Sequence, residues 1–200
     1  IAAAKLLRKK GYEVFLSDAG DEAKIDRDII DEIRKNEIEH EFGVHSDRVF
    51  DTDIVVVSPG VPQNSPVIQN ALAKGLEVVS EIEAASWYCK GKVIAITGTN
   101  GKTTTTTLIG EMFKDAGYKT FVCGNIGIAF SDIVEQTDDR SIVVLETSSF
   151  QLDNIKKFKP FIAIMLNVTP DHLDRYESFE KYLESKMRIA ENQNESDYFV

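Results

Sequence analysis

Short apolar runs alternate along the chain with segments in which apolar residues recur every three or four positions. Such runs are typical of strands buried on both faces of a parallel sheet, and the spaced pattern is typical of amphipathic helices. The sequence therefore predicts an α/β protein with mainly parallel sheets. Strands are expected at 12–18, 53–58, 76–79, 93–97, 118–122, 141–146, 161–167 and 198–200, and helices at 1–10, 26–36, 66–74, 82–88, 103–116 and 179–192.

A second series of elements begins near residue 90, where a Gly-Lys pair precedes the buried strand expected at 93–97. We therefore expect two three-layer α/β domains, formed by residues 1–90 and 91–200. A chain of 200 residues is long enough to bury a core in each.

Composition narrows the possible partners. The chain carries 33 acidic and 23 basic residues, a net charge of −10, which argues against nucleic acid or an anionic membrane as a partner of the whole surface. An acidic protein can still bind phosphate locally, through backbone N–H groups and one or two lysines.

The apolar runs fall far short of the roughly 20 residues of a membrane helix. Cys89 and Cys123 lack CxxC spacing and are interpreted as reduced thiols of a cytoplasmic protein.

The most specific motif is Thr-Gly-Thr-Asn-Gly-Lys-Thr-Thr at 97–104, between an expected strand and an expected helix. Glycines let successive N–H groups turn toward a phosphate, the helix N-terminus attracts its charge, and Lys102 can reach the terminal phosphates. The hydroxyl of Thr103 can bind Mg²⁺. Ile96 stands where the general P-loop has a glycine, so the motif is a shortened variant; the alternative is an ordinary strand–turn–helix corner. ATP is favoured over a dinucleotide because the chain has no GxGxxG.

Polar residues follow three further strands and are expected at the same rim of the sheet. Glu146 ends the strand at 141–146 and is placed to hold Mg²⁺, although it could equally be a helix-capping or loop residue. His172, flanked by two aspartates, is either a ligand or a structural histidine. The Gly-Asn-Ile-Gly segment at 124–127 is either part of the site or an ordinary loop. Lys186, taken alone, is interpreted as a solvated lysine of a helix.

Five segments together resemble the Mur ligase family of cytoplasmic peptidoglycan synthesis. They are 58–62, 97–104, 124–127, 145–152 and 167–176. The 97–104 loop is shared by the whole superfamily, including folylpolyglutamate synthases, whereas Ser-Ser-Phe-Gln-Leu at 148–152 is similar to the branch that adds D-glutamate. The resemblance implies a Rossmann-like, UDP-substrate-binding domain at 1–90 and a P-loop ATPase-like central domain at 91–200. It also implies a fragment, truncated at both ends and lacking a third, C-terminal domain.

The resemblance also implies a role for each matching position. The ATP-binding residues would be Gly98, Thr99, Asn100, Gly101, Lys102, Thr103 and Thr104. One Mg²⁺ would be held by Thr103 and Glu146, and a second by His172 and Lys186 as a carbamate. The muramoyl-alanine part of the substrate would contact Asn125, Ser148 and His172, and the uridine pocket would be lined by Asp18, Gly60 and Val61. The catalytic set would be Lys102, Glu146, His172 and Lys186.

The activity implied is ATP-dependent addition of D-glutamate to UDP-N-acetylmuramoyl-L-alanine through an acyl phosphate, by a monomer. Two anions must meet in that reaction, and metal ions with Lys102 would offset their repulsion. Three alternatives stay open. They are a sibling Mur ligase or folylpolyglutamate synthase-like ligase, a P-loop module that hydrolyses or senses ATP, and a non-catalytic nucleotide-sugar-binding module.

Overall fold

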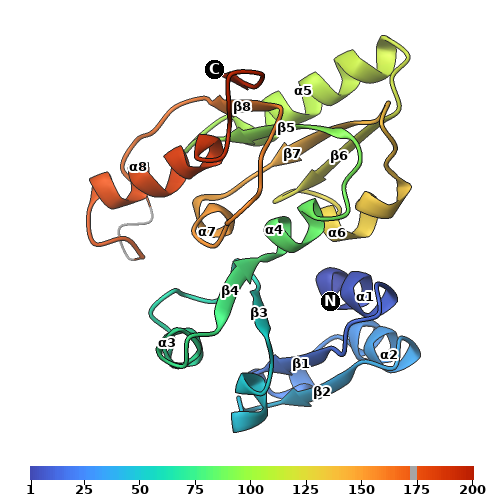
Figure 1. Cartoon of the computed structure of the whole chain (residues 1–200), viewed down its shortest axis with the longest axis vertical. Helices are drawn as coiled ribbons and strands as arrows, with labels where there is room; N and C mark the ends of the chain where they lie inside the picture. The colour runs from blue at the N-terminus through green and yellow to red at the C-terminus, as the bar shows by residue number, and fades with distance from the viewer. Residues whose placement is uncertain (172–174) are drawn as a thin grey trace. The chain divides into compact units, whose positions relative to one another are not determined.

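The computed structural model describes residues 1–171 and 175–200 (Figure 1). The chain forms two compact units, one of residues 1–56 with 63–78 and one of residues 57–62 with 79–200. The change of unit lies at Val78–Val79 because α4 (Glu81–Ser86) packs against α6 (Phe130–Ile133), where the Glu81 carboxylate accepts the Ser131 N–H. The functional boundary near residue 90 stays a prediction.

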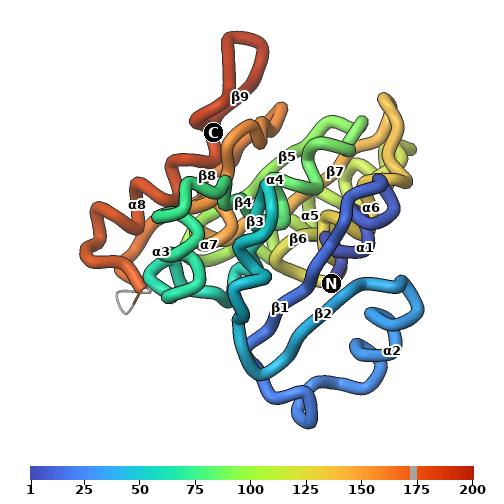
Figure 2. The backbone as a smooth tube through the Cα atoms, turned by 60° about the horizontal axis from the view of Figure 1, so that its bottom comes forward, coloured from blue at the N-terminus to red at the C-terminus, as the bar shows by residue number. Residues whose placement is uncertain are grey.

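The first unit has the predicted alternation of strands and helices. Its elements are α1 (Ala2–Lys9), β1 (Phe15–Asp18), α2 (Arg27–Lys35), β2 (Glu39–Phe42), β3 (Ile54–Val57), α3 (Pro66–Ala73) and β4 (Glu77–Ser80), with 3₁₀ turns at Glu22–Lys24 and Asp47–Phe50. The strands form two pairs: β1 lies parallel beside β2 (Figure 2), and β3 pairs with β4. Strand β2 was not expected, because three of its four residues are polar and give no apolar run.

The second unit is built on one five-stranded sheet. Its strands are β5 (Lys92–Thr97), β6 (Thr120–Gly124), β7 (Ile142–Glu146), β8 (Ile162–Met165) and β9 (Tyr198–Phe199). The order is β6-β7-β5-β8-β9, and every neighbouring pair is parallel. The phosphate-loop strand β5 is therefore central, as a fully apolar strand requires.

Helices cover both faces of this sheet, which confirms the three-layer prediction for the second unit (Figure 1). Ile94 and Ile96 of β5 pack with Phe113 of α5 (Lys102–Asp115) on one face. The alternate residues, Val93 and Ala95, are buried on the other face, where α4, α6 and α7 (Ser149–Leu152) lie. The alternation of apolar side chains to opposite faces gives each face its own core.

The end of the described chain differs in detail from the prediction. Helix α8 (Phe179–Met187) ends five residues before the predicted position 192 and continues as a 3₁₀ turn, Arg188–Ala190. The guanidinium of Arg188 donates to the backbone carbonyls of Asp153 and Ile155, which fixes this end of the helix beside the loop after α7.

A buried carboxylate holds the turn that precedes β8. Glu83 of α4 accepts the backbone N–H groups of Lys156, Lys157 and Phe158, at distances of 2.7–3.1 Å, together with the indole N–H of Trp87. Three backbone N–H groups thus converge on one buried side chain, which holds this turn in place.

Candidate functional site

Four loops meet at the carboxyl edge of the five-stranded sheet because all of its strands are parallel. They follow β5, β6, β7 and β8 and begin at residues 98, 125, 147 and 166. Backbone hydrogen bonds join them: Asn125 N–H donates to the Glu146 carbonyl at 2.9 Å, and Thr99 N–H donates to the Asn167 carbonyl at 3.0 Å. The rim predicted from the order of strands is therefore present.

The loop after β5 has the backbone that the glycines predict. Gly98 has φ +150° and Gly101 φ +83°, and a Cβ at Gly98 would lie 3.2 Å from Leu166 Cβ. Asn167 holds the loop from the neighbouring strand, since its Oδ1 accepts Asn100 N–H at 2.9 Å and its Nδ2 donates to the Asn100 carbonyl at 3.0 Å. Sequence reasoning gave Asn167 no role, although its place directly after a strand was a usable signal.

Two lysines converge on one backbone carbonyl of the loop. Lys102 Nζ donates to the Gly98 and Thr99 carbonyls, both at 3.0 Å, and Lys186 Nζ donates to the same Gly98 carbonyl at 2.9 Å. The interpretation of Lys186 as solvated is wrong, because the residue is only 2% exposed. Burial lowers its pKa to about 8, the charge of Lys102 acts in the same direction, and that of Asp171 opposes it.

Glu146 and Thr103 form an oxygen pair suited to a hard divalent cation. Thr103 Oγ1 donates to Glu146 Oε2 at 2.9 Å, and Asn125 Nδ2 donates to Glu146 Oε1 at the same distance. Glu146 is 1% exposed, so a carboxylate stands directly beside the phosphate loop. A carboxylate and a hydroxyl oxygen fit Mg²⁺.

The second metal position depends on the chemical form of Lys186. An ammonium group repels a cation and does not fit a metal, whereas a carbamate offers two anionic oxygens and does. His172, the other predicted ligand, lies outside the described residues. In the remainder of the chain, no group of three or more His, Cys, Asp or Glu side chains gathers as a metal site.

The predicted substrate contacts have varied surroundings. Ser148 caps α7, where its Oγ accepts Gln151 N–H and the Gln151 side chain accepts Ser148 N–H, a capping box. Gly60 and Val61 lie in the turn after β3, closed by a 3.0 Å bond from Val61 N–H to the Ser58 carbonyl. Asp18 ends β1 in the other unit, and its Oδ1 accepts an N–H of the following turn.

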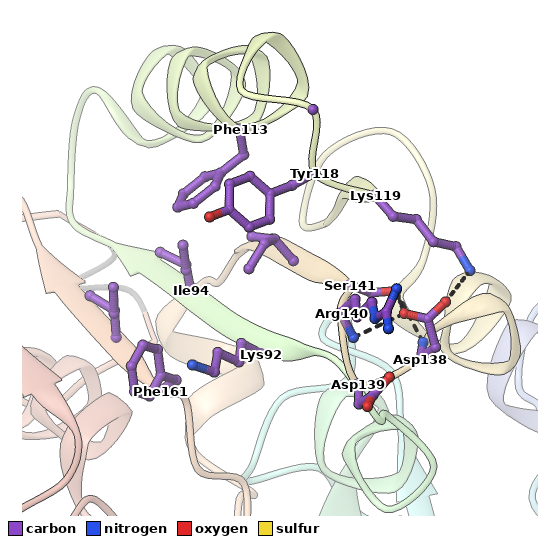
Figure 3. Close-up of a pocket in the computed structure, with 13 residues that line it drawn as sticks. Lys92, Ile94, Phe113, Tyr118, Lys119, Asp138, Asp139, Arg140, Ser141 and Phe161 are labelled. Carbon is purple, nitrogen blue, oxygen red and sulfur yellow. Dashed lines mark hydrogen bonds and ion pairs between the residues drawn. The ribbon is translucent and has the colours of Figure 1, made fainter.

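A cavity of about 660 Å³ opens at the opposite edge of the sheet, at the amino ends of the strands (Figure 3). Phe113 and Tyr118 lie on one side of it, and Phe161 lies on the other, with the Lys92 amine 4.4 Å from the centre of its ring. Asp138 accepts a hydrogen bond from Lys119. None of the predicted site residues lines it. This cavity is therefore separate from the phosphate loop.

Comparison with known proteins identifies the family. Residues 96–200 match the profile of the Mur ligase middle domain, and residues 3–67 match that of the MurD N-terminal domain. The chain belongs to the Mur ligase family. The resemblance drawn from the five sequence segments is confirmed.

Relatives of this Mur ligase chain extend well beyond it. A UDP-N-acetylmuramoylalanine--D-glutamate ligase of Salinibacter ruber is 49% identical over 205 residues, which cover 100% of the chain and 44% of that protein. The chain thus spans less than half the length of this curated relative.

Two solved structures share the Mur ligase fold. The UDP-N-acetylmuramate:L-alanyl-gamma-D-glutamyl-meso-diaminopimelate ligase from Neisseria meningitides has a TM-score of 0.61 at 18% identity and covers 100% of this chain and 66% of its own. The MurF ligase from Thermotoga maritima, in complex with ADP, has a TM-score of 0.51 at 20% identity, covering 100% and 46%. At such identities the likeness concerns the fold alone, and it agrees with the α/β prediction.

The structure therefore brings together part of the predicted Mur ligase site. Lys102, Thr103, Asn125, Glu146 and Lys186 surround one loop, as the contacts above describe. Their roles, and those of the remaining predicted residues, stay predictions. Cys89 and Cys123 are free thiols, and no helix in the described part of the chain is long and apolar enough to cross a membrane.

Proposed function

We propose that the protein to which this chain belongs is an ATP-dependent ligase that adds D-glutamate to UDP-N-acetylmuramoyl-L-alanine. The observation that carries the reaction class is the buried Glu146 carboxylate bonded to Thr103, directly beside a glycine-lined loop with two lysines. The substrate follows from relatives such as that of Salinibacter ruber, whose name specifies it. The ADP bound to the MurF ligase supports an adenine nucleotide as the ligand.

The loop and Lys102 would bind the phosphates of ATP. Backbone N–H groups of residues 98–104 and the N-terminus of the 14-residue helix α5 offer positive charge without a basic surface. Lys102 now donates to the Gly98 and Thr99 carbonyls, and its flexible stem lets it exchange these bonds for phosphate oxygens. Thr103 and Glu146 would hold one Mg²⁺, which when bound supplies charge stabilisation to the phosphoryl group.

Amide formation then takes two displacements. The carboxylate of the alanyl substrate attacks the γ-phosphorus, ADP leaves, and an acyl phosphate forms. The amine of D-glutamate attacks the acyl carbon, loses a proton, and releases inorganic phosphate. The role of Lys102 and the loop N–H groups is to hold two anions in contact and to stabilise charge on the transferring phosphoryl group.

Lys186 would act as a carbamate together with His172, holding a second Mg²⁺. Its burial against the loop supports this role, because an exposed lysine beside a phosphate loop would be an ordinary anion-binding ammonium. A carbamate would replace repulsion between Lys102 and Lys186 with attraction. We further propose a cytoplasmic monomer, in keeping with the free thiols and the small-molecule substrates.

The test is phosphate release by the full-length protein with ATP, Mg²⁺ and UDP-N-acetylmuramoyl-L-alanine, with and without D-glutamate. We expect release only when all are present, a product heavier by one glutamyl residue, and a loss of at least about a hundredfold in Lys102→Ala. L-glutamate, L-lysine and meso-diaminopimelate serve as competing amines. A preference for one of these would indicate a sibling ligase, and phosphate release without the muramoyl substrate would indicate a separate ATPase.

A further inference from the structure

Arg175 is an exposed arginine whose side chain is nevertheless fixed in place. Its Nη1 donates to the Pro59 carbonyl at 3.2 Å and its Nη2 donates to the Gly60 carbonyl at 2.8 Å. The guanidinium carbon lies 4.4 Å from the centre of the Phe150 ring. All three partners belong to the same compact unit, which contains residues 57–62 and 79–200. The guanidinium thus donates through two of its nitrogens and packs its flat face on the Phe150 ring.

The platform under the guanidinium is itself anchored. The ring of Phe150 stacks on Tyr176 with 5.8 Å between centroids and 7° between planes. The Tyr176 hydroxyl donates to Asp153 Oδ2 at 2.8 Å and lies 3.1 Å from Ser185 Oγ. An arginine held on such a ring has few alternative positions, so the carbonyls that it binds are held as well.

Binding two successive carbonyls fixes two peptide planes of the 58–62 turn. In a trans peptide the N–H points opposite to the carbonyl. With the Pro59 carbonyl turned toward Arg175, the Gly60 N–H is directed to the other side of the turn. The next N–H, that of Val61, is already used by the Ser58 carbonyl at 3.0 Å. Arg175 therefore selects the direction in which this turn presents its Gly60 donor.

We propose that Arg175 is a positioning residue that holds the 58–62 turn in the conformation that binds the uridine end of the nucleotide-sugar substrate. This inference rests on the proposed function for the identity of that ligand, and on the predicted uridine pocket at Gly60 and Val61 for its place. The bonding pattern favours arginine. A lysine can donate to two carbonyls, as Lys102 does, but it lacks the planar fork that lies flat on the Phe150 ring while its two ends reach separate carbonyls.

The rival explanation is direct contact, in which Arg175 pairs with the carboxylate of the substrate's alanine. UDP separates the two, because UDP carries the uridine end and lacks that carboxylate. We would measure the Kd of UDP and of UDP-N-acetylmuramoyl-L-alanine by calorimetry on the full-length protein, for wild type, Arg175→Ala and Arg175→Lys. Arg27→Lys, an exposed arginine of α2, is the matched control.

We expect Arg175→Ala to weaken both ligands by the same factor, about tenfold, since two charge-assisted bonds that order the turn are lost. Arg175→Lys should show most of this loss of affinity, and Arg27→Lys should show none. Phe150→Leu, which removes the platform and leaves the guanidinium, should weaken UDP by a smaller factor. The KM for ATP should stay within about twofold of wild type in every variant, because the phosphate loop keeps its own contacts.

Unchanged UDP affinity in Arg175→Ala, with weaker binding of the full substrate, would overturn the proposal in favour of direct contact. Equal losses for ATP and UDP would overturn it in favour of general destabilisation. A wild-type protein that fails to bind UDP would also overturn it. A wild-type protein that binds UDP but does not add D-glutamate would defeat the proposed function and leave the role of Arg175 testable by the same titrations.

Discussion

At the scale of the residue, the burial of Lys186 is a feature that the sequence pattern does not reveal. A pattern of polar and apolar positions counts lysine as polar, and so it places Lys186 on the solvated side of its helix. In the structure Tyr182, Ser185 and Lys186 are all buried, and the amine shares the Gly98 carbonyl with Lys102. Two cations on one acceptor, out of water, favour the neutral amine. The neutral amine is the form that reacts with CO₂, so the packing itself supports the proposed carbamate.

Glu81 gives a prediction about pH at the same scale. Its Oε1 accepts the N–H and hydroxyl of Ser131, yet burial dominates and raises its pKa above 4.5, with the charge of Asp132 acting in the same direction. Between the unfolded and the folded pKa, the folded state binds more protons, so the stability that Glu81 contributes is present at acid pH and lost as pH rises through that window. Each unit of pKa elevation is worth about 1.4 kcal/mol.

We expect Glu81→Gln to remove this loss, because the amide is neutral and its oxygen still accepts from Ser131. Relative to wild type, the variant should gain free energy of unfolding as pH rises from 4.5 to 7, measured by urea denaturation at several pH values. Glu77→Gln, at an exposed position, should show no such trend. A difference between Glu81→Gln and wild type that stays constant with pH would contradict the expectation.

At the scale of the element, the sequence predicted the helices and strands that have long periodic or apolar segments. Helix α5 was predicted in spite of its threonines and is present at Lys102–Asp115, because a phosphate loop must lead into a helix. The missed elements are short or polar: α6 and α7 have four residues each, and β2 has one apolar residue. Four residues are too few for a helical period to show. Contacts such as Arg175 on the 58–62 turn need the tertiary structure and have no local signal.

Two glycines allow a matched test of how β6 positions the carboxylate of the site. Gly117 ends α5 at φ +83°, and a Cβ there would meet nothing within 4 Å. Gly124 ends β6 at φ +107°, and a Cβ there would lie 2.3 Å from the Glu146 carbonyl oxygen and 2.7 Å from Leu145 Cδ1. Alanine at either position is strained by about 1–2 kcal/mol, but only at Gly124 must β7 also move.

We therefore expect Gly117→Ala to lose about 1 kcal/mol of unfolding free energy and to keep its nucleotide affinity. Gly124→Ala should lose several times more and bind Mg²⁺·ATP at least about tenfold more weakly, because the end of β7 carries Glu146. Urea denaturation and nucleotide titration measure the two effects. Equal losses in both variants would show that backbone strain alone matters and that the close approach at Gly124 does not.

At the scale of the whole molecule, the charge of −10 is compatible with the proposed phosphate site because the positive groups are local. They are the two lysine amines and the N–H groups at one rim of one sheet. Composition left such a site possible, and the motif at 97–104 predicted its place. It could not predict that residues 57–62 would cluster with the second unit, because that assignment depends on contacts between segments far apart in sequence, such as those of Arg175.

The division into two units leads to a prediction that one tryptophan can report. Trp87 is the single tryptophan of the 200-residue chain, and its indole N–H donates to the buried Glu83 in the second unit at 2.9 Å. Its fluorescence should therefore follow unfolding of that unit, whereas far-UV circular dichroism averages over both.

A ligand that binds only the folded second unit, at a hundred times its Kd, stabilises it by about 2.7 kcal/mol. We expect Mg²⁺·ATP to raise the denaturation midpoint measured by fluorescence. The dichroism curve should then show a second transition, that of the first unit, whose midpoint does not change. In Lys102→Ala the fluorescence midpoint should no longer respond. A shift that survives this substitution would place the nucleotide elsewhere, and a dichroism curve that moves as one transition would show that the two units unfold together.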